Sequence, residues 1–307
     1  MNSPDESCLD PEVDFLFQLF GGDDLIKSDI VAAELEFIQH LKALLASKLH
    51  ANLVPRLSGS LPRLLASLRK GDRIRQISDQ IAGDPEVLAN IMRAVNSPFY
   101  RLRSKKIESV DQALVILGEK GIREVIAAVT MKPIMTIQSN EGIDSALWDD
   151  STKCAAVCRM LSDGAGSEDS FSAYLSGLMH SVGLIAILRQ LAKATLPLKS
   201  ELSKPFTSAF VRELRKIYPR PMQIAMQWEL SEESLKIFAA FASDNQGDSP
   251  SLEILREAIF LTRANTLWRH GHYVVNDIGA AIQGEHRQRI WRKIFNDRTA
   301  PRADVAA

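Results

Sequence analysis

The sequence is poor in cysteine and histidine, the residues on which metal and redox chemistry most often depend. Only three cysteines and six histidines occur in 307 residues, and no two cysteines have the Cys-x-x-Cys spacing of a zinc or redox site. An odd number of cysteines in a chain of this length favours reduced thiols over a disulfide framework. Reduced thiols are typical of the cytoplasm, and we expect the protein there.

Long apolar runs and export signals are also missing. We find no apolar run that approaches the roughly 20 residues needed for a transmembrane helix. The first ten residues are polar and acidic, without the basic and apolar regions of a signal peptide. We therefore expect no association with a membrane.

The chain has almost no excess of either charge. It carries 37 Lys and Arg against 38 Asp and Glu, a formal net charge of -1. This balance provides no overall attraction to nucleic acid or to an anionic membrane, so we do not expect nucleic acid as a partner. The acidic residues gather before position 37, where Lys27 is the only basic residue, and basic residues gather between 287 and 302. Two solvated ends are the simplest interpretation; a docking surface, or contact between the two ends, is the alternative.

Helix signals follow one another along the chain, whereas no segment alternates like a long strand. Residues 30–53 are typical of an amphipathic helix, because apolar side chains recur every three or four residues: Ile30, Val31, Leu35, Ile38, Leu41, Leu45 and Leu49. Ser60 and Asp84 stand at N-cap positions ahead of prolines, and Ser109 forms a capping box with Gln112. The sequence therefore predicts an all-α fold.

A polar segment at 133–144 is expected to link two helical halves. In the first half, Gly118 and Gly121 mark a break between helices. In the second half the spacing predicts helices over 147–161, from Ser170 through His180 and beyond, and over 206–217, 222–230, 234–241, 252–268 and 278–295. A cluster of apolar residues near the N-terminus packs either on the domain or on a partner: Phe15, Leu16, Phe17, Leu19 and Phe20.

His180 is the first candidate for a functional residue. It is the only histidine between positions 51 and 269, and Ser181 follows it. In a metal-dependent phosphohydrolase of the His-Asp type the second position holds an aspartate, and both side chains bind the metal. A serine hydroxyl replaces neither the charge nor the ligand strength of that carboxylate. Asp149 and Asp150 are the best available companions. We favour a buried, hydrogen-bonded core histidine, with a weak or vestigial metal site as the alternative.

Two further groups of residues deserve a functional and a structural interpretation. Cys154 and Cys158 lie one helical turn apart and share a face, which favours buried small residues over a metal site that lacks other ligands. A basic, aromatic loop follows the helix that ends near Asn96, and its cations are Arg101, Arg103, Lys105 and Lys106. These cations could hold a phosphate or nucleic acid, but we favour the interpretation of a solvated loop. A phosphate-binding glycine loop and a Gly-x-Ser-x-Gly elbow are both absent.

Several short motifs follow one another in a distinctive order. In the first half they are Leu61-Pro62, Ile81-Ala82-Gly83-Asp84-Pro85, Ala94-Val95-Asn96-Ser97, Ile107-Glu108-Ser109-Val110, Ala113 and Leu117-Gly118. In the second half they are Leu147-Trp148, Gly177-Leu178-Met179-His180, Trp228-Glu229-Leu230 and Ala264-Asn265. Together they resemble the HDOD domain, the HD-related output domain of bacterial signalling proteins, over roughly residues 55 to 275.

This resemblance implies a fold of two helical lobes, at about 55–135 and 145–275, the second being HD-like. Residues 1–54 would then be an N-terminal extension and 276–307 a C-terminal helix and tail. The metal ligands of HD relatives do not carry over: Asp150 stands where they often have a histidine after Leu-Trp-x, Ser181 replaces the aspartate of the pair, and 238–241 contains no histidine. The Gly-Tyr-Pro motif of cyclic-dinucleotide phosphodiesterases is absent as well.

The resemblance implies a role in signal transduction. We expect a non-catalytic regulatory module that acts through contacts with other signalling proteins, without cofactor or metal, and that retains a vestigial HD site: Asp149, Asp150, His180 and Ser181. A metal-dependent phosphohydrolase or nucleotide phosphodiesterase with an atypical site is the first alternative. A nucleotide or nucleic-acid sensor that uses the basic loop at 101–106 is the second. The sequence leaves the partner, the stimulus and the oligomeric state open.

Overall fold

The computed structural model describes residues 10–20, 32–46, 61–70, 72–96, 107–135, 141–165, 170–193, 203–215, 249–273 and 289–292. These residues contain helices and no strand, which confirms the all-α prediction for the described part. The α-helices are α1 (Pro11–Leu19), α2 (Ala32–Ala46), α3 (Leu61–Lys70), α4 (Ile74–Ala82), α5 (Pro85–Val95), α6 (Val110–Met131), α7 (Glu141–Gly164), α8 (Ser170–Met179), α9 (Val182–Lys193), α10 (Lys204–Arg215) and α13 (Pro250–Arg269).

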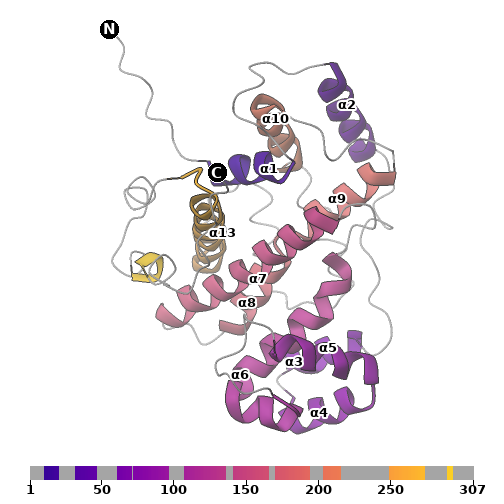
Figure 1. Ribbon diagram of the computed structural model, residues 1–307, viewed down its shortest axis with the longest axis vertical. Helices are drawn as coiled ribbons and strands as arrows, with labels where there is room; N and C mark the ends of the chain where they lie inside the picture. The colour runs from indigo at the N-terminus through magenta and orange to yellow at the C-terminus, as the bar shows by residue number, and fades with distance from the viewer. Residues whose placement is uncertain are drawn as a thin grey trace, which may run out of the picture.

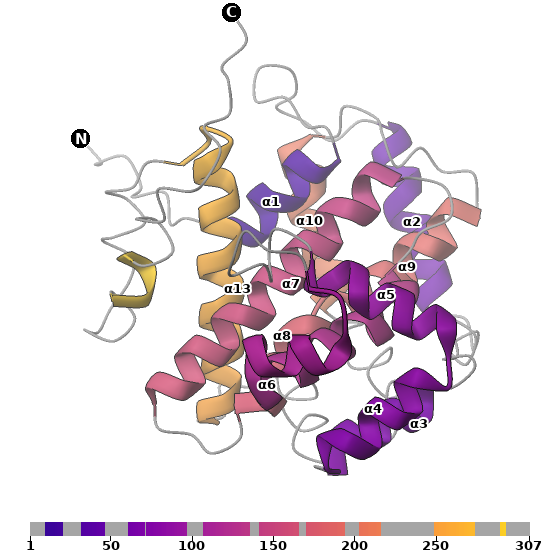
Figure 2. The ribbon, with the colours of Figure 1, turned by 60° about the horizontal axis from the view of Figure 1, so that its bottom comes forward.

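Helices α3 to α6 gather at one end of the molecule, and α1, α2 and α10 lie at the other end, with α7, α8 and α13 between them (Figure 1). Figure 2 gives the same grouping from a second direction. Buried apolar side chains of both ends belong to one continuous core. Helices α7 and α8 pack most extensively, and α13 lies against both of them.

The helix starts in the first lobe follow the predicted capping residues. The Asp84 carboxylate accepts a hydrogen bond from the Val87 amide at 3.2 Å and begins α5. The Ser109 hydroxyl accepts one from the Gln112 amide at 3.1 Å and begins α6. Gly118 interrupts α6 with φ 70° and ψ 176°, a conformation that suits glycine because it has no Cβ. The predicted caps at Asp84 and Ser109 and the predicted break at Gly118 are confirmed.

The second lobe depends on a close approach between α7 and α8. A Cβ added to Gly177 would lie 2.7 Å from the Ala155 Cα and 2.8 Å from the Cys158 Sγ. Only glycine leaves room for the α7 backbone at this point, since real Cβ atoms essentially never come so close to a neighbour. The Gly177-Leu178-Met179-His180 motif is therefore a packing feature as well as the entry to the candidate site.

The Phe-rich segment near the N-terminus packs on the domain, and its phenylalanines are buried. Helix α1 lies against α13 and α10, and Phe15, Leu16, Phe17 and Phe20 are buried. The ring of Phe20 meets that of Phe210 edge-on at 5.6 Å. Of the two options that the sequence left open for this segment, packing on the domain is the one that occurs.

The structure differs from the expected helices at three places. The helix expected to run from Ser170 through His180 is interrupted there, because α8 ends at Met179 and α9 begins at Val182. The segment expected as a polar linker contains helical residues, namely part of a 3-10 helix at Lys132–Met135 and the start of α7 at Glu141. Leu35, expected in the buried stripe of α2, is 49% exposed.

One segment, Ser170–Arg189, is by length and composition apolar enough to cross a membrane, although the sequence analysis found no such run. It has a mean hydropathy of 1.6, and 89% of its apolar window is buried inside the fold. The short break at His180 and Ser181 lies within it. Because neighbouring helices already cover this segment, its apolar side chains form the core of the second lobe.

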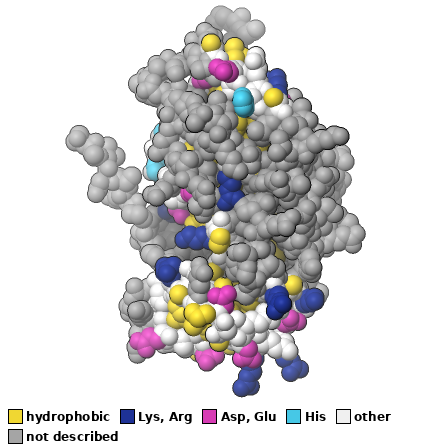
Figure 3. All heavy atoms as spheres, turned by 90° about the vertical axis from the view of Figure 1, so that its right-hand side faces the viewer, with side chains coloured by type: hydrophobic (Ala, Val, Ile, Leu, Met, Phe, Trp, Pro, Cys, Tyr) yellow, Lys and Arg dark blue, Asp and Glu magenta, His cyan; other side chains and the backbone are white. Residues whose placement is uncertain are grey.

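Acidic and basic side chains are interspersed on the face shown in Figure 3, mainly over the first lobe at its lower end. On that face the coloured side chains form no extended patch of one sign, in line with the balanced composition. The basic loop of Arg101, Arg103, Lys105 and Lys106, the helices expected over 222–241, and the motif Trp228-Glu229-Leu230 lie outside the described residues.

Candidate functional site

The candidate site lies where the turn between α8 and α9 meets α7. His180 sits in this turn, is 2% exposed, and points toward Asp150 of α7. Its Nδ1 donates to the Gly177 carbonyl at 2.7 Å, and its Nε2 lies 3.1 Å from the Asp150 Oδ2 and 2.9 Å from the Ser181 Oγ. The helix break therefore aims the imidazole across the α7–α8 contact and not along the helix surface.

Both ring nitrogens of His180 face oxygen atoms, which favours its protonated form. The Gly177 carbonyl can only accept, so Nδ1 carries a proton. An unprotonated Nε2 would direct its lone pair at the ionised Asp150 carboxylate, and only the Ser181 hydroxyl could donate to it. The imidazolium satisfies both contacts. Burial lowers the pKa of His180, but the contacts with Cys154 and Asp150 raise it by more. The net pKa therefore lies above its usual value, at about 10. The site therefore holds a buried imidazolium–carboxylate pair.

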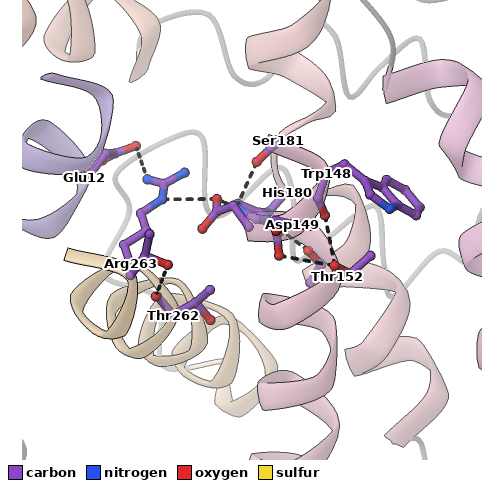
Figure 4. A network of polar contacts seen from close by, with 11 residues as sticks. Glu12, Trp148, Asp149, Thr152, His180, Ser181, Thr262 and Arg263 are labelled. Carbon is purple, nitrogen blue, oxygen red and sulfur yellow. Dashed lines mark hydrogen bonds and ion pairs between the residues drawn. The ribbon is translucent and has the colours of Figure 1, made fainter. Parts of the chain in front are cut away.

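Arg263 of α13 completes the site from the opposite side (Figure 4). Its side chain is 1% exposed, and its Nε lies 3.4 Å from the same Asp150 Oδ2 that faces His180. Its Nη1 lies 3.5 Å from the Glu12 Oε1 of α1, and its guanidinium stands 5.1 Å from the centre of the Phe15 ring. Burial raises the pKa of Asp150, whereas Arg263 and His180 lower it, and the net pKa is lowered.

Acidic and basic groups thus alternate along one line, from Glu12 through Arg263 and Asp150 to His180. We call these four residues the ion chain. It joins α1, α13, α7 and the α8–α9 turn, so residues up to 251 positions apart in sequence share one charge network. The ion chain thus connects the N-terminal helix with the HD-like lobe through charged groups at the predicted site.

Of the four residues predicted for the vestigial HD site, the structure brings together Asp150, His180 and Ser181. Asp149 is not part of the group: its side chain is 66% exposed and its carboxylate lies 3.7 Å from the Lys153 ammonium. Successive residues of a helix point about 100° apart, so one of two adjacent aspartates must turn away. Including Asp149 in the site is therefore wrong on the geometry of α7.

Sequence reasoning missed Arg263 and Glu12. A signal for Arg263 was present, because it interrupts an apolar stripe of α13 that contains Ile259 and Leu267, four residues away on either side. A charged side chain at such a position is buried only when a partner neutralises it. Glu12 interrupts no apolar stripe in this way, since it lies among several other acidic residues.

The two cysteines of α7 are buried and free of disulfide bonds. Burial is the main reason that the pKa of Cys154 is well above its usual value, and its neighbour Cys158 raises it further. A neutral thiol without solvent access is a weak nucleophile. Both cysteines pack against α8, and the predicted role as small buried residues agrees with their position. Cys8 lies outside the described residues.

The arrangement does not fit the metal ion that HD relatives bind. A divalent metal needs several donors that converge on one open position, but the Nε2 of His180 is directed at the Asp150 carboxylate and its Nδ1 at the Gly177 carbonyl. The Asp150 Oδ2 already accepts from His180 and faces Arg263, whose positive charge repels a metal ion. In the described part of the chain no group of three or more His, Cys, Asp or Glu side chains is placed to hold a metal.

A serine-hydrolase relay does not fit either. In such a relay the serine contacts one ring nitrogen of the histidine and the orienting carboxylate contacts the other. Here Ser181 and Asp150 both lie at Nε2, and Nδ1 is occupied by the Gly177 carbonyl. The hydroxyl has no path for its proton through the imidazole, so this triad of residue types has no nucleophilic function.

The all-α architecture and the comparison with known families together define the class of protein, a signalling-related, HD-like family. The chain belongs to the HDOD domain family, whose model matches residues 54–240. Helices α1 and α13, which supply Glu12 and Arg263 to the ion chain, both lie outside that matched segment.

Three solved structures share this fold. An HDOD domain protein of unknown function from Geobacter sulfurreducens has a TM-score of 0.57 and 18% identity, over 86% of this chain and 88% of that one. A "putative phosphohydrolase" from Shewanella amazonensis has a TM-score of 0.56 and 16% identity, over 86% and 94%. A "putative signal transduction protein" from Marinobacter aquaeolei has 0.59 and 16%, over 86% and 63%. No curated protein matches the sequence.

Proposed function

We propose that this protein is a non-catalytic regulatory module of the bacterial cytoplasm that relays a signal through contacts with other signalling proteins. Its membership of the HDOD domain family supports the link to signalling. The observation that carries the non-catalytic part is the ion chain, in which the groups of the former metal site bind one another. In an enzyme these groups would have to be available to metal, water or substrate.

Burial supports the same proposal. The side chains of Asp150, His180 and Arg263 are each 1% exposed. A phosphate ester could reach them only if α1 or the α7–α8 contact opened, and opening would separate buried opposite charges in a medium of low dielectric constant. Such a separation is strongly unfavourable. The HD-like lobe therefore serves as a rigid support, and signalling contacts belong to its outer surface.

The first test is a comparison of metal content and phosphohydrolase activity between the wild-type protein and His180→Ala. The protein is loaded with Mn²⁺ or Zn²⁺, desalted, analysed for metal, and assayed with a phosphomonoester and a cyclic dinucleotide. We expect no stoichiometric metal and the same background hydrolysis in both proteins. Stoichiometric metal and turnover in the wild type, both lost in His180→Ala, would overturn the proposal. His40→Ala, on α2, is the matched control for a histidine outside the site.

The second test concerns the protein contacts themselves. A tagged full-length chain is cross-linked in cells, and its partners are identified and then confirmed with purified components. A specific partner that binds wild type and His180→Ala with equal affinity supports a relay that needs no metal chemistry. If purified candidates show no binding to the wild-type chain, the regulatory role through protein contacts is wrong.

A metal-dependent phosphohydrolase or nucleotide phosphodiesterase is the second candidate function. One observation favours it: Asp150 and His180, two side chains able to bind metal, lie within 3.1 Å of each other in the HD-like lobe. The fold neighbour from Shewanella amazonensis carries the name of a phosphohydrolase. The metal and activity measurements above decide between the two functions, since only the enzyme loses turnover in His180→Ala.

A further inference from the structure

We propose that the Arg263 guanidinium is the resident cation of the HD-like site and replaces the metal ion as the positive charge that balances Asp150. This inference rests on the proposed non-catalytic function and accounts for a buried carboxylate, Asp150, at a position where HD relatives often have a histidine. It also makes α1 part of the site, because Glu12 is the second carboxylate bound to the same cation.

The position of Arg263 is the first argument. Asp150 and His180 stand at the positions that HD relatives use for metal ligands, and the Arg263 Nε lies 3.4 Å from the Asp150 Oδ2. Glu12 lies 3.5 Å from the Nη1 at the other end of the guanidinium. A planar guanidinium with several donors can serve two carboxylates from different helices at once. A cation therefore stands between acidic ligands, as in a metal site, but a covalent bond attaches it to α13.

The charge balance is the second argument. Asp150 and Glu12 each carry a carboxylate, and the positive charge of Arg263 lies within 3.5 Å of both. Arginine is protonated at every pH at which the protein is folded, so this charge does not depend on metal supply or on pH.

The surroundings of Arg263 form the third argument. It is among the largest fully buried side chains of the protein, and the face of the Phe15 ring lies 5.1 Å from its guanidinium. An arginine that packed here only as an aliphatic spacer would extend its charged end to solvent. Here the charged end is the most enclosed part, with carboxylates on two sides and an aromatic ring beside it.

Removal of the α1 contribution is not an easy opening motion. Phe15, Leu16, Phe17 and Phe20 are buried, and the apolar side chains of α1 that pack on the domain would become exposed if α1 left it. The guanidinium is consequently a fixed component, unlike a metal ion that equilibrates with solvent. The Arg263 charge is therefore a permanent part of the site, and removal of that charge tests its role.

The test is a double-mutant cycle on the full-length protein, measured by urea unfolding. Arg263→Met removes the cation and leaves Asp150 and Glu12 underbalanced, so it lowers the folding equilibrium constant strongly. Asp150→Asn removes the charge that Arg263 balances. If the two residues form one charge pair, the double variant retains a folding constant about tenfold or more above the product of the single effects. Effects that simply multiply would overturn the inference, because a spacer role needs no charge partner.

A matched control uses Arg123, which binds the Glu119 carboxylate at 2.8 Å in the first lobe and does not touch the site. The effects of Arg123→Met and Asp150→Asn are expected to multiply. Should Arg263→Met fail to fold, the pair Glu12→Gln and Asp150→Asn gives the opposite sign. The buried guanidinium then loses both carboxylates that it contacts, and the double variant is about tenfold less stable than the product. A multiplicative result in that pair also contradicts the proposal.

Metal analysis of the same proteins separates this inference from the proposed function. Stoichiometric metal in the wild type that His180→Ala abolishes would overturn both. Multiplicative cycles in a protein without stoichiometric metal would overturn only the role of Arg263 and leave the regulatory module intact. Coupled cycles together with no stoichiometric metal in the wild type are the expected result.

Discussion

Glu124 of α6 gives the sharpest prediction of pH-dependent stability. The residue is 8% exposed, and its Oε1 lies 3.0 Å from the Arg159 Nε of α7. Burial raises the pKa of Glu124 from 4.5 to about 7; Arg159 lowers it in part, Asp163 raises it and Lys120 lowers it. The carboxyl group therefore lies at the contact of two helices in a setting that favours its neutral form.

The raised pKa has a defined effect on the free energy of unfolding. Because the folded state binds the proton more tightly than the unfolded state, stability is fully present below pH 4.5 and is lost as the pH rises toward 7. One unit of pKa corresponds to about 1.4 kcal/mol, so the shift corresponds to a loss of about 3 kcal/mol above pH 7. Glu124→Gln removes the titration and keeps the shape of the side chain.

We expect Glu124→Gln to be nearly as stable as wild type at pH 4.5 and more stable by about 3 kcal/mol at pH 8. Urea unfolding of both proteins at several pH values between these limits measures the difference in free energy of unfolding. The contributions of the other titrating groups cancel in this difference, because both proteins contain them. Glu119→Gln is the control, since this glutamate lies on the same helix and its carboxylate is exposed beside Arg123. A difference between Glu124→Gln and wild type that does not change with pH would refute the reasoning.

Three further substitutions follow from packing and hydrogen bonds. Gly177→Ala places a methyl group against the α7 backbone and should lower the free energy of unfolding by about 1–3 kcal/mol in urea, whereas Gly83→Ala, with its nearest atom at 3.5 Å, should change it by less than about 1 kcal/mol. Phe20→Ala should cost about 3–5 kcal/mol and lower the thermal midpoint; an unchanged midpoint would contradict the buried position of α1. Asn96→Ala removes three hydrogen bonds to Met92 and Ile107 and should cost about 2 kcal/mol, with faster amide exchange at Ile107 as the local readout.

Local signals predicted local structure well. The caps at Asp84 and Ser109 and the break at Gly118 depend on residues within a few positions of one another, and the chemistry of those residues is enough to place them. The family resemblance came from the same short motifs. Leu35 was wrongly expected to be buried. It fits the apolar spacing of α2, but the neighbouring helices do not cover the part of the helix surface on which it lies.

The site was predictable only in part, for a physical reason. Asp150 and His180 were identified as companions, since both lie in motifs of the second half of the chain. The contact of Arg263 with Asp150 spans 113 residues, and periodicity carries no information about which helices meet. The break that turns His180 toward α7 was also missed, because apolar residues continue on both sides of His180 and Ser181 and suggest a single long helix.

The hydrogen bond between Asp14 and Tyr273 joins residues 259 positions apart, which has a consequence for the order of events during synthesis. At about 5–20 residues per second, a ribosome needs roughly 10–50 s to make that length of chain. During this interval α1, with its phenylalanines, is already outside the ribosome while α13 has not yet been made. The nascent chain thus carries an apolar helix without its main partner until α13 has been made. Chaperone demand and the harm done by truncations ahead of α13 should both reflect that delay.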